Sequence, residues 1–304
     1  MKVYAAIYNN DLIRKQSSSG GIFYLLSKQF DVVYGVSMSD DLYSAQFVRT
    51  TEDVSKIMGS KYLQAEIGDT YKNVKIDLDA NKSVLFTGTP CQIKGLKLFL
   101  QKDYEKLFAC DVICHGAPSK KLWKEYVTYK EKEYGKLHTI NFRSKKNGWK
   151  NYGVLENDNF LDKNNHAYMR MFLRDYCLRP SCYNCLAKNE YVSDFTIGDF
   201  WGIEKVLTGL DDDKGTSLIL SRTEKGDLLF NSIKNQLKYS EVNYDDVKSY
   251  NPALFESAKK PKMRDDFYKD LEKVSFNKMI RKYGADFTGS LPKRIIKKVL
   301  NKLK

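Results

Sequence analysis

Six cysteines are the residues of this chain most suited to do chemistry. Cys182 and Cys185 form a C-x2-C pair, and Cys177 lies five residues before it. Cys91 and Cys114 each follow a segment with the character of a β-strand. A C-x2-C pair holds two thiolates near one metal, and two more thiolates complete a tetrahedral zinc site or a four-iron cluster. The spacing alone leaves open a cluster, a structural zinc site and buried unligated thiols.

Short turns rich in glycine and serine form a second group. Residues 16–22 (QSSSGGI) open an apolar helix, where backbone N–H groups favour an anion. Taken alone, this turn is better explained as the start of an ordinary capped helix. Residues 59–62 (GSKY) supply a hydroxyl, a cation and an aromatic ring that could meet a phosphate and a flavin or base. In residues 87–92 (TGTPCQ) a glycine and a proline bracket Cys91 at a strand end, where ligand crevices of α/β sheets lie. Residues 197–202 (IGDFWG) place an acid and two aromatics at another strand end, which a packed aromatic turn also explains.

The chain has three histidines. His115, beside Cys114, is a candidate to orient a ligand or relay a proton. His138 and His166 are expected to be structural or exposed. The sequence contains no H-E-x-x-H zinc motif, and Cys110, within a predicted strand, is expected to be a core thiol.

The composition is that of a globular protein with 304 residues and a net charge of +13. No apolar run is long enough to span a bilayer, and the N-terminus does not resemble a secretion signal, so we expect a cytoplasmic protein with reduced cysteines. Six Lys/Arg and no acid lie within 287–304. The rest of the chain is also basic, which fits an anionic lipid, a phosphorylated ligand or nucleic acid. No nucleic-acid-binding motif is present, so we expect no specific nucleic-acid partner.

Strand–turn–helix repeats position these residues. Strands are predicted at 3–8, 31–36, 45–49, 83–86, 107–113, 195–200 and 217–221, and helices at 22–30, 51–58, 92–100, 118–129 and 224–236. A hairpin is predicted over 138–153. This order favours an α/β fold, a mixed sheet with flanking helices. We divide the chain into a domain at 1–240 and a helical, basic C-terminal region at 241–304.

Taken in order, eight segments resemble the β-subunit family of coenzyme F420 hydrogenases and dehydrogenases, across residues 16–226. They read SSSGGI, GSKY, TGTPCQIKGLK, DVICHGAPS, FRSKKNGW, CYNC, SDFTIGDFWGIEK and GTSLILSRTEKG. The resemblance implies a non-Rossmann α/β domain that binds FAD and one [4Fe-4S] cluster, passes electrons between them, and exchanges hydride with a mobile cofactor or substrate.

By motif, the resemblance implies four cluster ligands, Cys91, Cys114, Cys182 and Cys185, with Cys177 as an extra cysteine near the cluster or a replacement for one of them. The implied flavin-binding residues are Ser18, Ser19, Gly20, Gly21, Ser60, Lys61 and Tyr62, and we add Thr89 as a cofactor-binding candidate.

The variant of the pattern looks like a bacterial branch associated with cell-surface polysaccharide genes. It implies a redox partner protein or mobile hydride carrier, with a deazaflavin-like cofactor, a nucleotide sugar or another glycan as substrate. The competing interpretation is a zinc-stabilised, non-redox accessory protein of polysaccharide biosynthesis. Residues 291–304 have the spacing of a cationic amphipathic helix, which predicts either peripheral contact with the inner face of a membrane or docking on protein.

Overall fold

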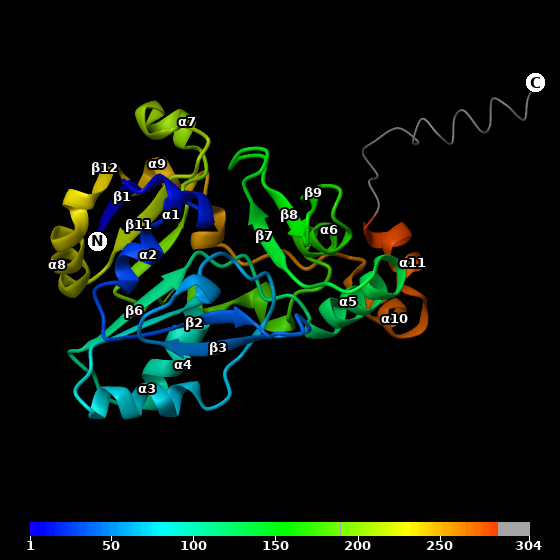
Figure 1. The fold of residues 1–304 in the computed structure, drawn as a ribbon, viewed down its shortest axis with the longest axis horizontal. Coiled ribbons are helices and arrows are strands. Elements are labelled where there is room, and N and C mark those ends of the chain that lie inside the picture. The colour runs from blue at the N-terminus through cyan, green and yellow to red at the C-terminus, as the bar shows by residue number, and fades with distance from the viewer. Residues whose placement is uncertain (189, 285–304) are drawn as a thin grey trace, which may run out of the picture.

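A nine-stranded mixed sheet forms the larger part of the molecule (Figure 1). The computed structural model describes residues 1–188 and 190–284. Four central strands, β10, β6, β5 and β2, run parallel, and antiparallel pairs flank them on both sides. In sheet order the strands are β12 (Leu237–Glu241), β1 (Lys2–Tyr8), β11 (Ser217–Ser221), β10 (Phe195–Asp199), β6 (Leu107–Val112), β5 (Val84–Gly88), β2 (Val32–Met38), β3 (Ala45–Thr50) and β4 (Ala65–Glu66).

Helices cover both faces of this sheet because its strands are apolar on both sides. In β1, Val3 and Ala5 face one core cluster while Tyr4 and Ala6 face another, as the two-residue repeat of a strand requires. One face packs on α2 (Ile22–Ser27) and α8 (Glu224–Ile233). The opposite face packs on α3 (Thr70–Asp79) and α4 (Pro90–Leu100) at one end, and on α7 (Ile203–Val206) and α9 (Tyr244–Lys248) at the other.

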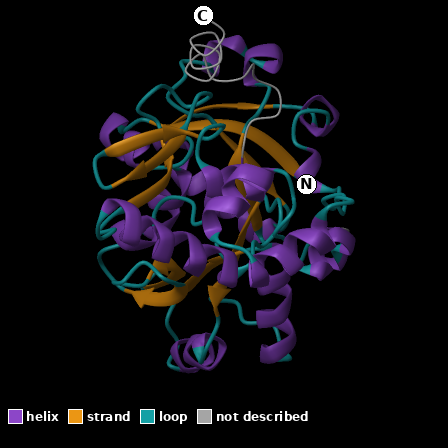
Figure 2. Cartoon of the chain, turned by 90° about the vertical axis from the view of Figure 1, so that its right-hand side faces the viewer, coloured by secondary structure: helices purple, strands orange, loops and turns teal. Residues whose placement is uncertain are grey.

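A smaller lobe is built on a three-stranded antiparallel sheet. Its strands are β7 (Ile140–Ser144), β8 (Gly153–Glu156) and β9 (Asn159–Asp162). Figure 2 views the molecule from the side of this lobe, with its helices toward the viewer. These helices are α5 (Lys120–Tyr134), α6 (Ala167–Leu173), α10 (Arg264–Lys273) and α11 (Phe276–Met279). A short π-helix at Ile280–Gly284 follows α11. Trp123, Phe142 and Tyr168 are buried at its centre.

One buried carboxylate ties the small sheet to α5 and α6. Glu156 accepts a hydrogen bond from Tyr126 (2.5 Å) and lies 3.0 Å from Nε2 of His166 and 2.9 Å from Nζ of Lys130. Burial alone would raise the pKa of Glu156, but these partners hold it at about 2. His166 also caps α6, since its Nδ1 accepts from the backbone N–H of Met169. His166 therefore has the structural role expected for it, and His138 is exposed.

The predicted fold class is confirmed: the sheet is mixed, helices flank it, and a helical segment lies near the C-terminus. The hairpin is also present, with β7 and β8 paired antiparallel. The helix predicted over 51–58 is wrong, since only the 3-10 turn Ser55–Ile57 forms there. Asp53 accepts from the backbone N–H of Ser55 (2.8 Å), so it closes a local turn and does not join a helix. The boundary at residue 240 stays a prediction.

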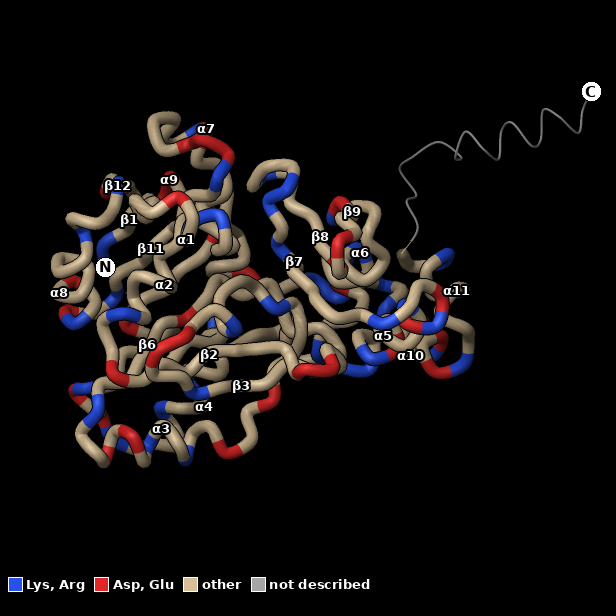
Figure 3. Tube along the Cα trace, viewed as in Figure 1, with Lys and Arg blue, Asp and Glu red and all other residues tan. Residues whose placement is uncertain are grey.

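Charges are interspersed along the described trace (Figure 3). Among the described helices none is long and apolar enough to cross a membrane. The predicted amphipathic helix at 291–304 lies outside the described residues.

Candidate functional site

The turn after α1 (Asp11–Gln16) lies close against the main sheet. A Cβ on Gly20 would stand 2.5 Å from the backbone oxygen of Ala6 and 2.8 Å from the backbone nitrogen of Ser217. Gly21 has φ +90°, a conformation that side chains other than glycine rarely adopt. Both glycines predicted to bind a cofactor thus have a structural reason to be glycine. The helix that follows, α2, has only six residues, so its N-terminus alone makes no anion site.

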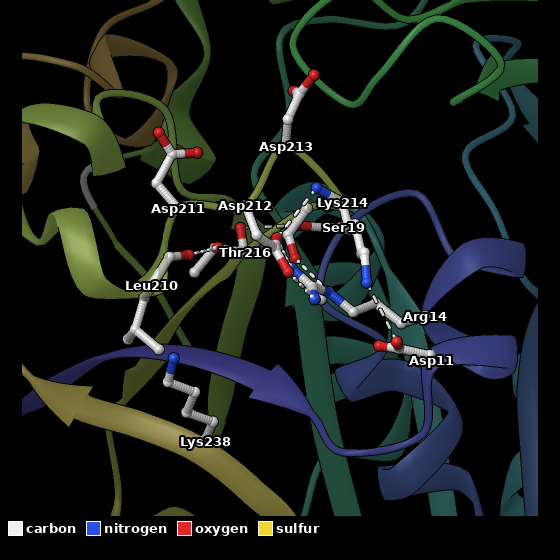
Figure 4. A network of polar contacts seen from close by, with 12 residues as sticks. Asp11, Arg14, Ser19, Leu210, Asp211, Asp212, Asp213, Lys214, Thr216 and Lys238 are labelled. Carbon is white, nitrogen blue, oxygen red and sulfur yellow. Dashed lines mark hydrogen bonds and ion pairs between the residues drawn. The ribbon is translucent and has the colours of Figure 1, made fainter.

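A polar network joins this turn to the loop before β11 (Figure 4). Ser19 donates to the backbone oxygen of Thr216 (2.8 Å). Arg14, which is buried, donates from Nη1 to the carboxylate of Asp212 (2.7 Å) and from Nε to the backbone oxygen of Gly215 (2.9 Å). These contacts connect residues about 200 positions apart in the sequence and fix the turn that carries the predicted flavin-binding serines.

Lys145 ties the small lobe to the same turn. Its ammonium donates to three backbone oxygens, those of Arg14 (2.9 Å), Ser19 (2.7 Å) and Lys214 (2.7 Å). Burial lowers the pKa of Lys145 to about 7. Because all three N–H groups have carbonyl partners, Lys145 acts on the site by positioning the loop between β7 and β8 against Ser19.

The two predicted flavin-binding segments are in direct contact. The hydroxyl oxygens of Ser18 and Ser60 are 2.9 Å apart, and the backbone N–H of Ser60 donates to Ser18 Oγ (2.8 Å). Lys61 donates to the backbone oxygens of Met58 (2.5 Å) and Gly59 (3.2 Å), and burial lowers its pKa to about 7. The structure therefore brings together residues 18–21 and 60–62, which are some forty positions apart in the sequence.

Arg143, on β7, lies at the centre of an aromatic and acidic cluster. Its Nη1 forms an ion pair with Asp199 (2.8 Å) and donates to the hydroxyl of Tyr62 (3.3 Å). Its guanidinium carbon lies 3.8 Å from the ring centre of Tyr152 and 5.3 Å from that of Trp201. Burial works against its charge, yet the Asp199 carboxylate and the nearby tyrosines hold the pKa of Arg143 above its ordinary value.

Four of the predicted cluster ligands lie near one another. The thiolate charges of Cys91, Cys182 and Cys185 all act on Cys114, and together with burial they raise the pKa of Cys114 to about 12. Burial and the charges of Cys91 and Cys185 likewise raise the pKa of Cys182. Cys91 is exposed and the other three are half-buried. Three separate segments thus converge: the start of α4, the loop after β6, and the 3-10 turn at Pro180–Asn184 with Cys185 directly after it.

Hydrogen bonds hold these cysteine segments in place. Thr89, which caps α4, has its hydroxyl 3.2 Å from Cys91 Sγ. Cys182 Sγ accepts from the backbone N–H of Ala117 (3.3 Å). Lys188 is buried and donates to the backbone oxygens of Cys114 (2.7 Å) and Ala253. Burial lowers the pKa of Lys188, while the thiolates of three neighbouring cysteines oppose that change.

The remaining two cysteines lie elsewhere. Cys177 is fully buried in the core of the small lobe, where burial raises its pKa to about 12, and its charge acts on Tyr168, Tyr183 and Tyr268. Cys110 is buried within β6, as expected of a core thiol. The described environment of Cys177 is therefore the aromatic core of the small lobe.

His115 lies between the cysteines and the serine turns. Its Nε2 is 2.6 Å from the carboxylate of Asp175, and its ring meets the edge of Phe172 with centres 5.4 Å apart. Phe172 in turn packs on Tyr62 (5.2 Å between ring centres). His115 and Phe172 thus connect the Cys114 loop to the predicted flavin-binding segment.

Within residues 1–188 and 190–284, no three or more His, Cys, Asp or Glu side chains are placed so that they could hold one metal ion. A tetrahedral zinc site and a four-iron cluster both use four thiolates, so the donor types of the cysteine set are compatible with either group.

Sequence reasoning missed three cations of the site as individual residues: Arg143, Lys145 and Lys188. The first two lie in FRSKKNGW, which we quoted only as a family segment. Lys188 follows the C-x2-C pair by three positions, and its charge directly after the uncharged residues 180–187 was the available signal.

Comparisons with known proteins agree with this architecture. The family model for the C terminus of the coenzyme F420 hydrogenase/dehydrogenase β subunit matches residues 81–247, more than half of the chain. The protein therefore belongs to the coenzyme F420 hydrogenase/dehydrogenase β-subunit family, which indicates an oxidoreductase-related role. No curated protein matches the chain.

The fold is similar to that of a chain in the xenon-derivatised F420-reducing [NiFe] hydrogenase complex from Methanosarcina barkeri. The TM-score is 0.55 at 16% identity, and the match covers 92% of this chain and 90% of that one. At this identity the likeness establishes the fold alone.

Proposed function

We propose that this protein is an iron–sulfur flavoprotein oxidoreductase, with one [4Fe-4S] cluster held by Cys91, Cys114, Cys182 and Cys185. The observation that carries the proposal is the convergence of these four thiols from three segments: Cys91 and Cys185 are among the neighbours that, with burial, raise the pKa of Cys114 and Cys182, and Lys188 and Ala117 donate hydrogen bonds to the Cys114 backbone oxygen and the Cys182 thiol. Four thiolates are the donor set of a four-iron cluster. Cys177, buried among tyrosines, is outside this set.

We assign FAD to the neighbouring surface formed by residues 18–21 and 60–62. The Ser18–Ser60 contact supports this assignment, since it joins two segments with hydroxyl and backbone donors. Lys61 adds a cation with two carbonyl partners. Thr89 lies on the cysteine side, within reach of Cys91, and would contribute its hydroxyl there.

With both groups bound, a flavin would supply two-electron hydride exchange and a cluster one-electron transfer. The residues of the chain position and connect the two regions. His115, held by Asp175, and Phe172 connect the Cys114 loop to Tyr62. We further propose that the protein exchanges electrons with a redox partner protein, or hydride with a deazaflavin-like carrier or a glycan-related substrate.

Cofactor analysis of anaerobically purified protein tests the proposal. We expect a brown-yellow protein with about four irons and one FAD per chain. Cys182→Ser and Cys185→Ser should each abolish iron binding, because a hard hydroxyl replaces a soft thiolate. Cys110→Ser is the matched control, and it should retain iron. One zinc per chain in a colourless sample would refute the redox function and favour the zinc-stabilised accessory protein.

A further inference from the structure

The guanidinium of Arg143 has an unused edge. Nη1 serves Asp199 and Tyr62, but Nε and Nη2 have no hydrogen-bond partner among the described residues and are shielded from solvent. Burial raises the pKa of Tyr152, and its hydroxyl lies close enough to Arg143 for both the charge and hydrogen bonding of the guanidinium to oppose that rise. Even so, Nε and Nη2 have no hydrogen bond of ordinary length and angle among the described residues. Leaving two charged donors buried and unpaired is costly, so such an edge calls for an acceptor.

The same edge is occupied in another arginine of the chain. Arg49 donates from Nε (2.7 Å) and Nη2 (2.9 Å) to the two carboxylate oxygens of Asp77. This is the bidentate geometry with which arginine binds a carboxylate or phosphate. The other buried side-chain atoms without a partner in the described residues are carboxylate oxygens, so Arg143 is the one cation among them.

Two lysines also lie near Arg143. Burial lowers the pKa of Lys145 and of Lys163, and the positive charge of Arg143 lowers both further. Asp199 opposes this change for both lysines, together with Asp212 for Lys145 and Asp162 for Lys163. Lys163 lies over the ring of Tyr152 at 4.3 Å and donates to the backbone oxygen of Lys150 (3.0 Å), so it leaves the Nε–Nη2 edge of Arg143 without an anionic partner.

We propose that the Nε–Nη2 edge of Arg143 binds two oxygens of an oxyanion, the phosphate or carboxylate of a bound ligand, beside Tyr62 and Trp201. Binding satisfies both free donors with charge-assisted hydrogen bonds. The oxyanion comes either from the phosphates of the flavin dinucleotide or from a second ligand. That choice of source rests on the proposed function, whereas the oxyanion site itself does not.

The site is tested by titrating cofactor-free protein with inorganic pyrophosphate. Binding is measured by calorimetry and by tryptophan fluorescence, to which the nearby Trp201 contributes. Arg143→Lys keeps the charge but loses the fork, and should weaken binding by about tenfold or more. Asp199→Asn removes the competing carboxylate, keeps an acceptor for Trp149, and should tighten binding. Arg49→Lys is the matched control, and it should bind pyrophosphate as the parent does. Circular dichroism confirms that each variant is folded.

Comparing the binding of FAD with that of riboflavin, which has no phosphate, identifies the source of the oxyanion. If Arg143→Lys weakens FAD but not riboflavin, the oxyanion is the flavin's phosphate. If it leaves FAD unchanged but weakens pyrophosphate binding to the flavin-loaded protein, the oxyanion belongs to a second ligand. A chain that binds no flavin yet shows Arg143-dependent pyrophosphate binding refutes the flavin assignment and upholds this site. Equal pyrophosphate affinity in Arg143→Lys and the parent, or equal losses for riboflavin and FAD, overturns the proposal.

Discussion

Replacing Lys188 by methionine tests how the cysteine segments are held. The change keeps most of the side-chain volume and removes a buried ammonium that donates to the backbone oxygens of Cys114 and Ala253. A hydrogen bond from a charged donor contributes about 1.5–3 kcal/mol, so the two together contribute about 3–6 kcal/mol. The cost of burying the charged ammonium offsets part of this stabilisation, because burial disfavours the charged form of Lys188 and lowers its pKa.

We therefore expect Lys188→Met to lower the free energy of unfolding by about 2–4 kcal/mol, with the two carbonyls left unsatisfied. For a chain of this length each kcal/mol corresponds to a melting-point change of about 2 °C, which predicts a fall of about 4–8 °C. Iron content per chain should fall as well, because the loop that carries Cys114 loses its connection to Ala253. Lys188→Gln keeps a hydrogen-bond donor without the charge, so its melting point and iron content should lie between those of the parent protein and Lys188→Met.

Lys94→Met is the matched control, since Lys94 pairs with Glu190 at the surface. Exposed ion pairs contribute at most about 1 kcal/mol, so its melting point should change little. Urea denaturation, differential scanning fluorimetry and iron analysis on the same anaerobic preparations give the comparison. If Lys188→Met is as stable and as rich in iron as Lys94→Met, Lys188 does not hold the cysteine segments and the reasoning is wrong.

Four further results are expected. Lys61→Glu should reduce flavin retained after gel filtration more than iron content, since a charge-assisted hydrogen bond of about 1.5–3 kcal/mol becomes a repulsion; unchanged flavin would place Lys61 outside the site. Cys177→Ser should cost about 1–3 kcal/mol in urea denaturation, by burying a hydroxyl, and leave iron unchanged; loss of iron would make Cys177 a ligand. The pKa of Glu156 is held at about 2, against an ordinary value of 4.5. Its contribution to the free energy of unfolding is therefore present above pH 4.5, and about 3 kcal/mol of it is lost as the pH falls toward 2. Glu156→Gln should flatten the corresponding fall in the urea midpoint. Removing residues 291–304 should abolish flotation with anionic liposomes at low salt; a full-length chain that does not float makes this segment a packing element.

Local signals in the sequence were enough to predict most elements near the site. Ser119 begins α5 as a side-chain cap, and the apolar stretch before Cys91 forms β5. The error at 51–58 has a local cause too, because the pattern there does not distinguish an Asp in a first helical turn from an Asp that closes its own turn. Strand β12, added at the edge of the sheet beside β1, was missed because only one residue of its Leu237–Glu241 span, Tyr239, is a strong strand former.

The cations of the site could not be predicted in the same way, because their roles depend on distant partners. Lys145 is an ordinary surface lysine by sequence, yet its acceptors on Arg14 and Ser19 are 131 and 126 positions away. Lys188 likewise donates to Cys114, 74 positions away. Only the tertiary fold determines which backbone oxygens surround an ammonium, so a sequence pattern can indicate the segment but not the contact.

The topology of the sheet explains why the cysteines and the Arg143 cluster are neighbours. Strands β10, β6 and β5 are adjacent and parallel, so their carboxyl ends lie at one edge. Asp199 ends β10, Cys114 follows β6, and Cys91 follows β5. Neighbouring strands are about 4.8 Å apart, so the strands that carry Asp199 and Cys91 are separated by roughly 10 Å. Strand order therefore places the proposed oxyanion site beside the proposed cluster, so that a ligand held by Arg143 would lie next to the cysteines.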